Sequence, residues 1–246
     1  MKAVFGSLVC RGGTIKMNIR TMRRFLIFLM IVIVFPLTDA LAQPSRGKHS
    51  VTIDPAHGGG DLGVNVSDKE HEKNITLAIA SLMKKELDKS GNVQAQLTRT
   101  SDRDVSLSER KQIAKKMQSE VFVGIHVNAG FSKHSTGFEI YFPGFKGSSS
   151  EHSDSKEILK DMARNKYLND SVKLAQLIQK NMDKVFPRKS RGLRDSAIPS
   201  LEGLSIPAVV VEIGFATNPE DRKKILDEKT QEAIAHALCK SIRDFF

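Results

Sequence analysis

Two histidines and two glutamates occupy positions from which side chains of separate elements can converge. His57, His126 and Glu212 each end or follow an apolar run that predicts a buried strand. Glu72 stands at the start of a predicted amphipathic helix. Because the carboxyl ends of parallel strands meet at one edge of a sheet, we expect these side chains to lie close together.

This set of residue types predicts a metal-dependent hydrolase. Two histidines and one carboxylate with an open fourth position are typical ligands of catalytic zinc. A metal held there would activate a water molecule, and a further glutamate would accept its proton and pass it to a leaving group. The residues alone also allow surface histidines, and they allow a helix-capping role for Glu72 because helix N-termini favour carboxylates.

Three other chemistries are disfavoured by the sequence. The helical His-Glu-x-x-His motif is absent, because Ile75 stands where the second histidine after His71 would fall. Gly58-Gly59-Gly60 is not followed by the Gly-Lys-Ser/Thr of a phosphate-binding loop. Cys239 lies within a helical pattern, which predicts a buried, inert thiol rather than a nucleophile.

The N-terminus has the layout of a secretory signal peptide. A segment with three arginines precedes the apolar run 25–35, and an Ala-x-Ala site ends at Ala42. The run is shorter than the about 20 residues that a membrane-spanning helix needs, although an uncleaved anchor is the alternative. We therefore expect residues 1–42 to be a signal peptide, with Met17 or Met22 as a possible true start, and the mature protein to be periplasmic or secreted without a membrane span.

The charge of the chain argues against a nucleic-acid partner. The 246 residues carry a formal net charge of +10. Residues 1–42 contain six basic residues and one acidic residue, so about half of this charge belongs to the predicted signal. The remaining mild positive charge suits an anionic polymer such as a cell wall.

Predicted strands alternate with predicted helices through the rest of the chain, after a short leader at 43–49. This alternation predicts one α/β domain over 50–246, a three-layer sandwich whose mostly parallel central sheet is flanked by helices. The strands are expected at 50–54, 93–98, 120–126, 137–142 and 207–213, and the helices at 72–87, 106–117, 158–168, 172–185 and 231–245, with a short one opening at Pro219. Residues 187–192 are expected to form a basic turn.

Four stretches in order resemble the zinc-dependent N-acetylmuramoyl-L-alanine amidases of the type 3 family. They are Asp54-Pro55-Ala56-His57-Gly58-Gly59, Glu72-Lys73, Gly124-Ile125-His126-Val127-Asn128-Ala129 and Glu212-Ile213-Gly214-Phe215-Ala216-Thr217-Asn218. Arg99-Thr100 with Asp102, and Leu107 with Arg110, resemble the stretch between the family's two histidines. The resemblance covers nearly the whole predicted mature chain, and Ala56 departs from the glycine more common at that place.

The resemblance implies specific roles for the candidate residues. His57, Glu72 and His126 would bind Zn²⁺, and Glu212 would be the general base. His71 is a rival ligand to Glu72. The implied reaction is hydrolysis of the amide between the lactyl group of N-acetylmuramic acid and the L-alanine of the peptidoglycan stem peptide. Peptidoglycan would be the substrate of a monomeric enzyme.

Residues 146–169 form an insertion relative to the shortest family members. Some relatives carry a helix here that blocks the zinc site until an activator protein moves it, which makes Glu151, Glu157 and Asp161 candidates to reach the metal. A solvated surface helix is the alternative for this segment.

Two other functions remain compatible with the sequence. A zinc peptidase acting on the stem peptide would use the same ligands and base. An inactive wall-binding or activator protein would need no intact site, yet all four candidate residues are present.

Overall fold

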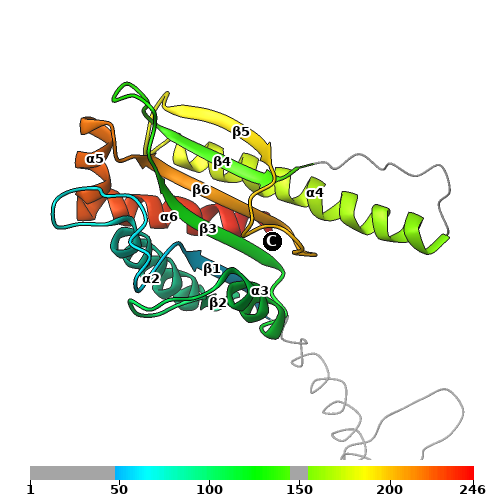
Figure 1. Cartoon of the computed structure of the whole chain (residues 1–246). Helices are drawn as coiled ribbons and strands as arrows, with labels where there is room; N and C mark the ends of the chain where they lie inside the picture. Colours follow the sequence, from blue (N-terminus) through cyan, green and yellow to red (C-terminus); the bar gives the residue numbers. More distant parts are fainter. Residues whose placement is uncertain (1–47, 145–154) are drawn as a thin grey trace, which may run out of the picture. The chain divides into compact units, whose positions relative to one another are not determined.

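A six-stranded sheet forms the centre of the domain. The computed structural model describes residues 48–144 and 155–246, with the side chains of 155–164 excepted. The strand order across the sheet is β2-β1-β3-β6-β4-β5 (Figure 1). The strands are β1 (His49–Pro55), β2 (Val93–Leu97), β3 (Val121–Asn128), β4 (Phe138–Pro143), β5 (Ser190–Ser196) and β6 (Ala208–Phe215), and the helices are α2 (Glu72–Ser90), α3 (Leu107–Lys116), α4 (Ser155–Met182), α5 (Pro219–Leu226) and α6 (Glu228–Phe245).

The sheet is mostly parallel, as the alternation of elements predicts. β1 pairs in parallel with β2 and β3, β3 with β6, and β4 with β5. The β4–β6 pair alone is antiparallel among the described strands. As a result, β1, β3 and β6 end at the same edge of the sheet, where the candidate residues are expected.

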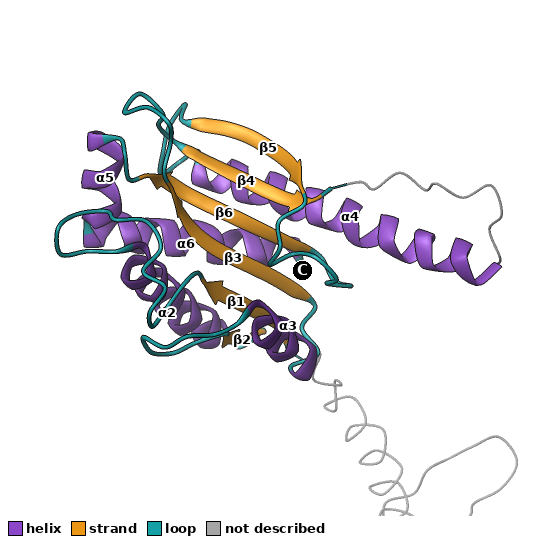
Figure 2. Ribbon diagram, in the orientation of Figure 1, coloured by secondary structure: helices purple, strands orange, loops and turns teal. Residues whose placement is uncertain are grey.

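The helices cover the two faces of the sheet unequally. α2, α4 and α6 pack on one face and α3 lies on the other (Figure 2). Strand residues alternate between the faces, so Val123 and Val211 enter the large core beneath α2, α4 and α6. Phe122 and Val210 enter a small cluster on the other face. The face that carries α3 is therefore the thinly covered one.

Helix boundaries follow from capping residues that the sequence displays. Ser106 caps the N-terminus of α3, where its hydroxyl accepts a hydrogen bond from the Glu109 amide. Asn218 caps α5, whose first turn contains Pro219. α2 ends at Gly91 in the left-handed conformation.

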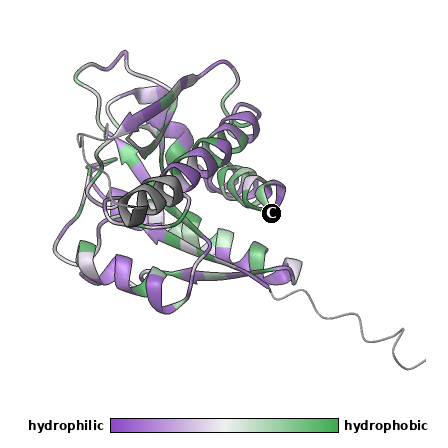
Figure 3. Cartoon of the chain, turned by 90° about the vertical axis from the view of Figure 1, so that its right-hand side faces the viewer, coloured by the Kyte–Doolittle hydropathy of each residue, from purple (hydrophilic) through white to green (hydrophobic). Residues whose placement is uncertain are grey.

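Two elements differ from the sequence prediction. α4 is one 28-residue helix across the gap expected between 168 and 172, and inside it the Ser171 hydroxyl donates to the Tyr167 carbonyl. Residues with hydrophilic and hydrophobic side chains share this helix (Figure 3). β5 forms where a turn was expected at 187–192. It is an edge strand rich in charged residues, so it lacks the apolar alternation that marks the other strands.

One further expectation, on the single cysteine of the predicted mature chain, is met by the described residues. Cys239 is fully buried, and burial raises the pKa of its thiol, as expected for an inert cysteine. Across residues 48–144 and 155–246, none of the helices combines the length and the apolar character needed to cross a membrane.

Candidate metal centre

Three ligand-bearing side chains from different elements converge at one edge of the sheet. His57 follows β1, His126 lies in β3 and Glu72 is the first residue of α2. Among the described residues, these three side chains form a cluster in which one ligand atom of each lies within 4.8 Å of the other two. His57 Nε2 is 3.1 Å and His126 Nδ1 is 3.2 Å from the Glu72 carboxylate.

The carboxylate of Glu72 is held by the backbone. Its side chain is almost completely buried, and its two oxygens accept hydrogen bonds from the amides of Val127 at 2.9 Å and Val64 at 3.0 Å. Burial raises the pKa of Glu72. The hydrogen bonds and charges of His126 and His57 lower it by more, so that the net pKa is about 2. Glu72 is therefore a carboxylate at neutral pH.

His71 lies outside the three-residue cluster. It is the N-cap of α2, and its Nδ1 atom is buried without a hydrogen-bond partner among the described residues. The helix register thus directs Glu72, rather than the rival ligand His71, toward His57 and His126.

His57 is held in an unusual backbone conformation with φ of 59°. Its carbonyl accepts a hydrogen bond from Arg110 Nη2 at 2.9 Å, and Arg110 also forms a buried ion pair with Asp54. Arg99 is fully buried and donates to the carbonyls of Pro55 and Ala56. The two arginines stabilise the turn that brings the imidazole to the centre.

The glycine loop after His57 is fixed by a second charge pair, between the mostly buried Lys73 and the half-exposed Asp102. Lys73 Nζ lies 2.8 Å from the Gly59 carbonyl and 2.7 Å from the Asp102 carboxylate. Asp102 also accepts a hydrogen bond from the Gly59 amide at 2.7 Å. Lys73 follows the ligand Glu72, so one helix start positions both the cluster and the loop around it.

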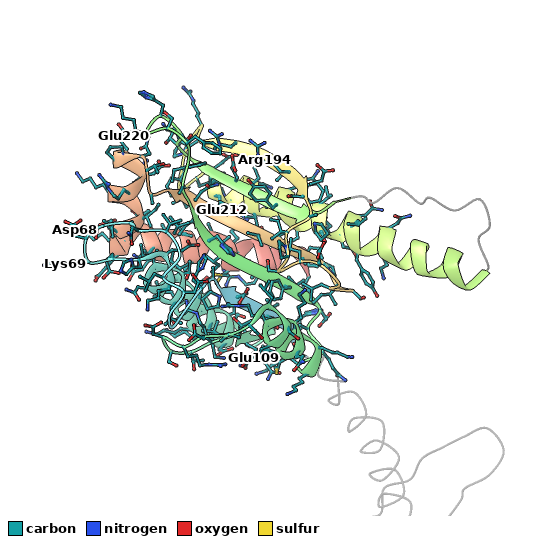
Figure 4. All side chains as sticks on the ribbon, in the orientation of Figure 1. Asp68, Lys69, Glu109, Arg194, Glu212 and Glu220 are labelled. Atoms are coloured by element: carbon teal, nitrogen blue, oxygen red, sulfur yellow. The ribbon has the colours of Figure 1, made fainter. Side chains whose placement is uncertain are left out.

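Glu212 lies next to His126, on the neighbouring strand β6. The two residues are paired in the β3–β6 register, and Figure 4 shows Glu212 on the middle of the sheet. Burial raises the pKa of Glu212 to about 7, with the nearby charges of Glu72 and Glu139 adding to the effect and His126 opposing it. Its Oε2 atom is buried without a hydrogen-bond partner among the described residues. A carboxyl in this state can accept and release a proton near neutral pH.

Sequence reasoning missed two polar residues of the centre. Asp61 accepts a hydrogen bond from His57 Nδ1 at 2.7 Å, and only its place in the glycine-rich loop marks it in the sequence. Glu139 is almost completely buried in β4 and pairs in register with Glu212. A charged residue inside the apolar run 137–142 was the signal that could have indicated it.

The inhibitory role expected for the insertion is not tested by the described residues. Glu151 and the side chains of Glu157 and Asp161 lie outside them. The first turns of α4 extend past the end of the sheet that is opposite to the carboxyl ends of β3 and β6 (Figure 1). This part of the helix therefore does not cover the three-residue cluster in the structure.

The donor set matches zinc. Two imidazole nitrogens and one carboxylate, with both imidazoles directed at the carboxylate, are the ligands of catalytic zinc sites that keep a fourth position open. The bond from His57 to Asp61 is the supporting contact expected of a metal-binding histidine. Fold and site together define a three-layer α/β protein with a candidate metal centre.

Comparison with known proteins identifies the family. The family model for N-acetylmuramoyl-L-alanine amidases (Amidase_3) matches residues 51–244. The amidase AmiA of Escherichia coli K12 is 28% identical over 228 residues, which cover 83% of this chain and 78% of AmiA.

Two solved structures show the same fold. An N-acetylmuramoyl-L-alanine amidase of Clostridium difficile 630 has a TM-score of 0.67 and 28% identity, covering 80% of this chain and 96% of that one. The CwlD amidase of Clostridioides difficile, solved in complex with the GerS lipoprotein, has a TM-score of 0.66 and 27% identity over 80% and 98% of the two chains. The chain belongs to the N-acetylmuramoyl-L-alanine amidase family and is a cell wall amidase.

Proposed function

We propose that this amidase is zinc-dependent and that His57, Glu72 and His126 hold the metal while Glu212 serves as the general base. The observation that carries the proposal is the convergence of three ligand atoms within 4.8 Å beside the carboxyl of Glu212, whose Oε2 has no hydrogen-bond partner among the described residues. Bound zinc would supply Lewis-acid activation of water and of the scissile carbonyl.

The residues of the chain account for the remaining chemistry. Glu212 lies beside His126, where it can accept a proton from the attacking water and deliver it to the leaving amine. Its raised pKa, about 7, suits both transfers at neutral pH. The substrate would be the amide between the muramic lactyl group and L-alanine of the stem peptide, and residues 1–42 would direct export to the periplasm or the cell exterior.

The test combines metal content with product analysis. The full-length protein is expected to contain about one zinc per chain and to release intact stem peptides from peptidoglycan, leaving free muramic lactyl groups. Glu212→Gln is expected to keep the zinc and lose activity by about 10²- to 10⁴-fold. Glu232→Gln, an exposed position on α6, is the matched control and should behave as wild type.

Three results would contradict the proposal. Cleavage within the stem peptide would indicate a peptidase. Full activity after zinc is removed would exclude the metal, and an active Glu212→Gln variant would exclude the base. Zinc binding without any hydrolysis would favour the wall-binding alternative, or an inhibited state that deletion of 155–168 should relieve.

A further inference from the structure

A row of polar side chains crosses the sheet face beside the candidate metal centre. His126 in β3 pairs with Glu212 in β6, and Glu212 pairs with Glu139 in β4. The edge strand β5 continues the row with Arg191 and Arg194, both of which contact Glu139. The row therefore leads from the metal ligands to two arginines at the edge of the sheet.

A β-bulge places both arginines on this face. Glu139 alone on β4 lies opposite two residues of β5, Arg191 and Gly192, where the register shifts. An extra residue changes which side chains share a face, so Arg191 and Arg194 point the same way although they are three positions apart. Gly192 adopts a φ of 92° that permits the bulge.

The arginines outnumber the carboxylate between them. One oxygen of Glu139 accepts hydrogen bonds from Arg191 Nε and from Arg194 Nη2 at 3.2 Å. The other accepts one from the Tyr141 hydroxyl at 2.7 Å and one from Asn128 Nδ2 at 3.4 Å. Only 5% of the Glu139 side chain is exposed. One buried negative charge thus anchors two positive charges.

Both guanidinium groups remain accessible. Their side chains are 38% exposed in Arg191 and 47% exposed in Arg194. Arg191 lies over the ring of Phe215, 5.0 Å from its centroid, and its two terminal nitrogens make no hydrogen bond to a described residue. Figure 4 labels Arg194 on β5 and Glu212 on β6, and β4 lies between these two strands. This is a pre-oriented guanidinium pair of the kind that binds carboxylates.

We propose that Arg191 and Arg194 form a subsite for a carboxylate of the stem peptide, on the leaving-group side of the scissile amide. The inference rests on the proposed function. The muramic carboxyl is consumed in the amide, so a nearby carboxylate belongs to the peptide. β5 lies two strands from β6, or about 10 Å at the usual strand spacing. An extended peptide covers this in about three residues, which places the carboxylate on the second or third residue.

The inference is tested by combining substrates with variants. Two pairs of synthetic N-acetylmuramoyl-tripeptides are compared. In the first pair the carboxylate of the second residue is either free or converted to a neutral primary amide. In the second pair the same change is made at the carboxylate of the third residue. The full-length wild type is expected to prefer the free carboxylate in one pair by about tenfold in kcat/KM, mainly through KM. Arg194→Gln and Arg191→Gln should reduce this preference toward one, and Arg222→Gln on the exposed side of α5 should keep it.

The outcomes separate this inference from the proposed function. Wild-type cleavage of both members of each pair at equal rates would overturn the subsite and leave the amidase intact. A variant that slows all substrates equally, with the preference retained, would assign the arginines to neutralising Glu139 and also overturn it. A wild type loaded with zinc that cleaves none of the substrates would overturn both.

Discussion

Asp61 accepts a hydrogen bond from Nδ1 of His57 at 2.7 Å. Because an ionised carboxylate can only accept, Nδ1 of the imidazole carries a proton, and Nε2, which faces Glu72, is the nitrogen that would be left to bind the proposed zinc. This pair sets both the tautomer and the ring orientation of a proposed zinc ligand. Asp61 is mostly exposed, so it orients the His57 ring through the position of its carboxylate rather than through burial.

Replacing Asp61 should weaken metal binding more than it weakens the fold. Asp61→Asn is expected to lower zinc affinity by about 10- to 100-fold, measured by competition with a chelator of known affinity. Asp68→Asn, in the same loop and exposed, is the control. Equal zinc affinities of the two variants would show that the His57–Asp61 bond does not support the metal.

Gly63 lies against two of the proposed ligands. A Cβ atom there would come within 2.6 Å of both Glu72 Oε2 and His57 Cδ2. Gly63→Ala is therefore expected to displace these side chains and to lower zinc affinity by at least about tenfold.

Gly91→Ala provides the matched control for Gly63→Ala. The two glycines have similar φ values, 66° and 76°, but no atom lies within 4 Å of a Cβ at Gly91. Each variant should lose about 1 kcal/mol of unfolding free energy from backbone strain, measured with urea on the zinc-free protein. Unchanged zinc affinity in Gly63→Ala would mean that the loop moves aside freely.

The fold and the candidate ligands were predictable because they depend on local patterns. Apolar runs mark β1, β3 and β6, and the residues that end them lie at one edge of the sheet. Contacts made across the sequence were not predictable in the same way. Glu139 lies beside Glu212 only because β4 runs antiparallel to β6, and no local pattern fixes that direction. β5 escaped prediction because its charged residues pair with Glu139 instead of a core.

Arg99 should be a major determinant of stability. It is fully buried and donates to four backbone carbonyls, including that of Lys73 at 2.8 Å. Arg99→Met would leave buried carbonyls with fewer donors, so we expect a loss of roughly 3 kcal/mol in the free energy of unfolding. Arg103→Met, at an exposed ion pair with Glu109, should cost less than about 1 kcal/mol. Similar losses in the two variants would contradict the structural role of Arg99.

Glu139 should make the stability of the fold depend on acid pH. Burial raises the pKa of Glu139, but hydrogen bonds from Arg191 and Tyr141 and the charge of Arg194 lower it more, so the net pKa lies below the ordinary 4.5. A carboxylate with a lowered pKa in the folded state contributes stability that is fully present above its unfolded pKa. That contribution is lost as the pH falls below about 4.5 and through the folded pKa.

The expected measurement is a difference between two proteins at two pH values. Unfolding free energies of wild type and Glu139→Gln are compared at pH 7 and pH 4 in excess chelator. Wild type should lose more stability on acidification than the variant, because the variant has no charge to lose at this position while all other carboxyls titrate in both. If the two proteins lose the same amount, the Glu139 carboxylate is not stabilised by Arg191 and Arg194, and the anchored guanidinium pair at the edge of the sheet would lack its electrostatic basis.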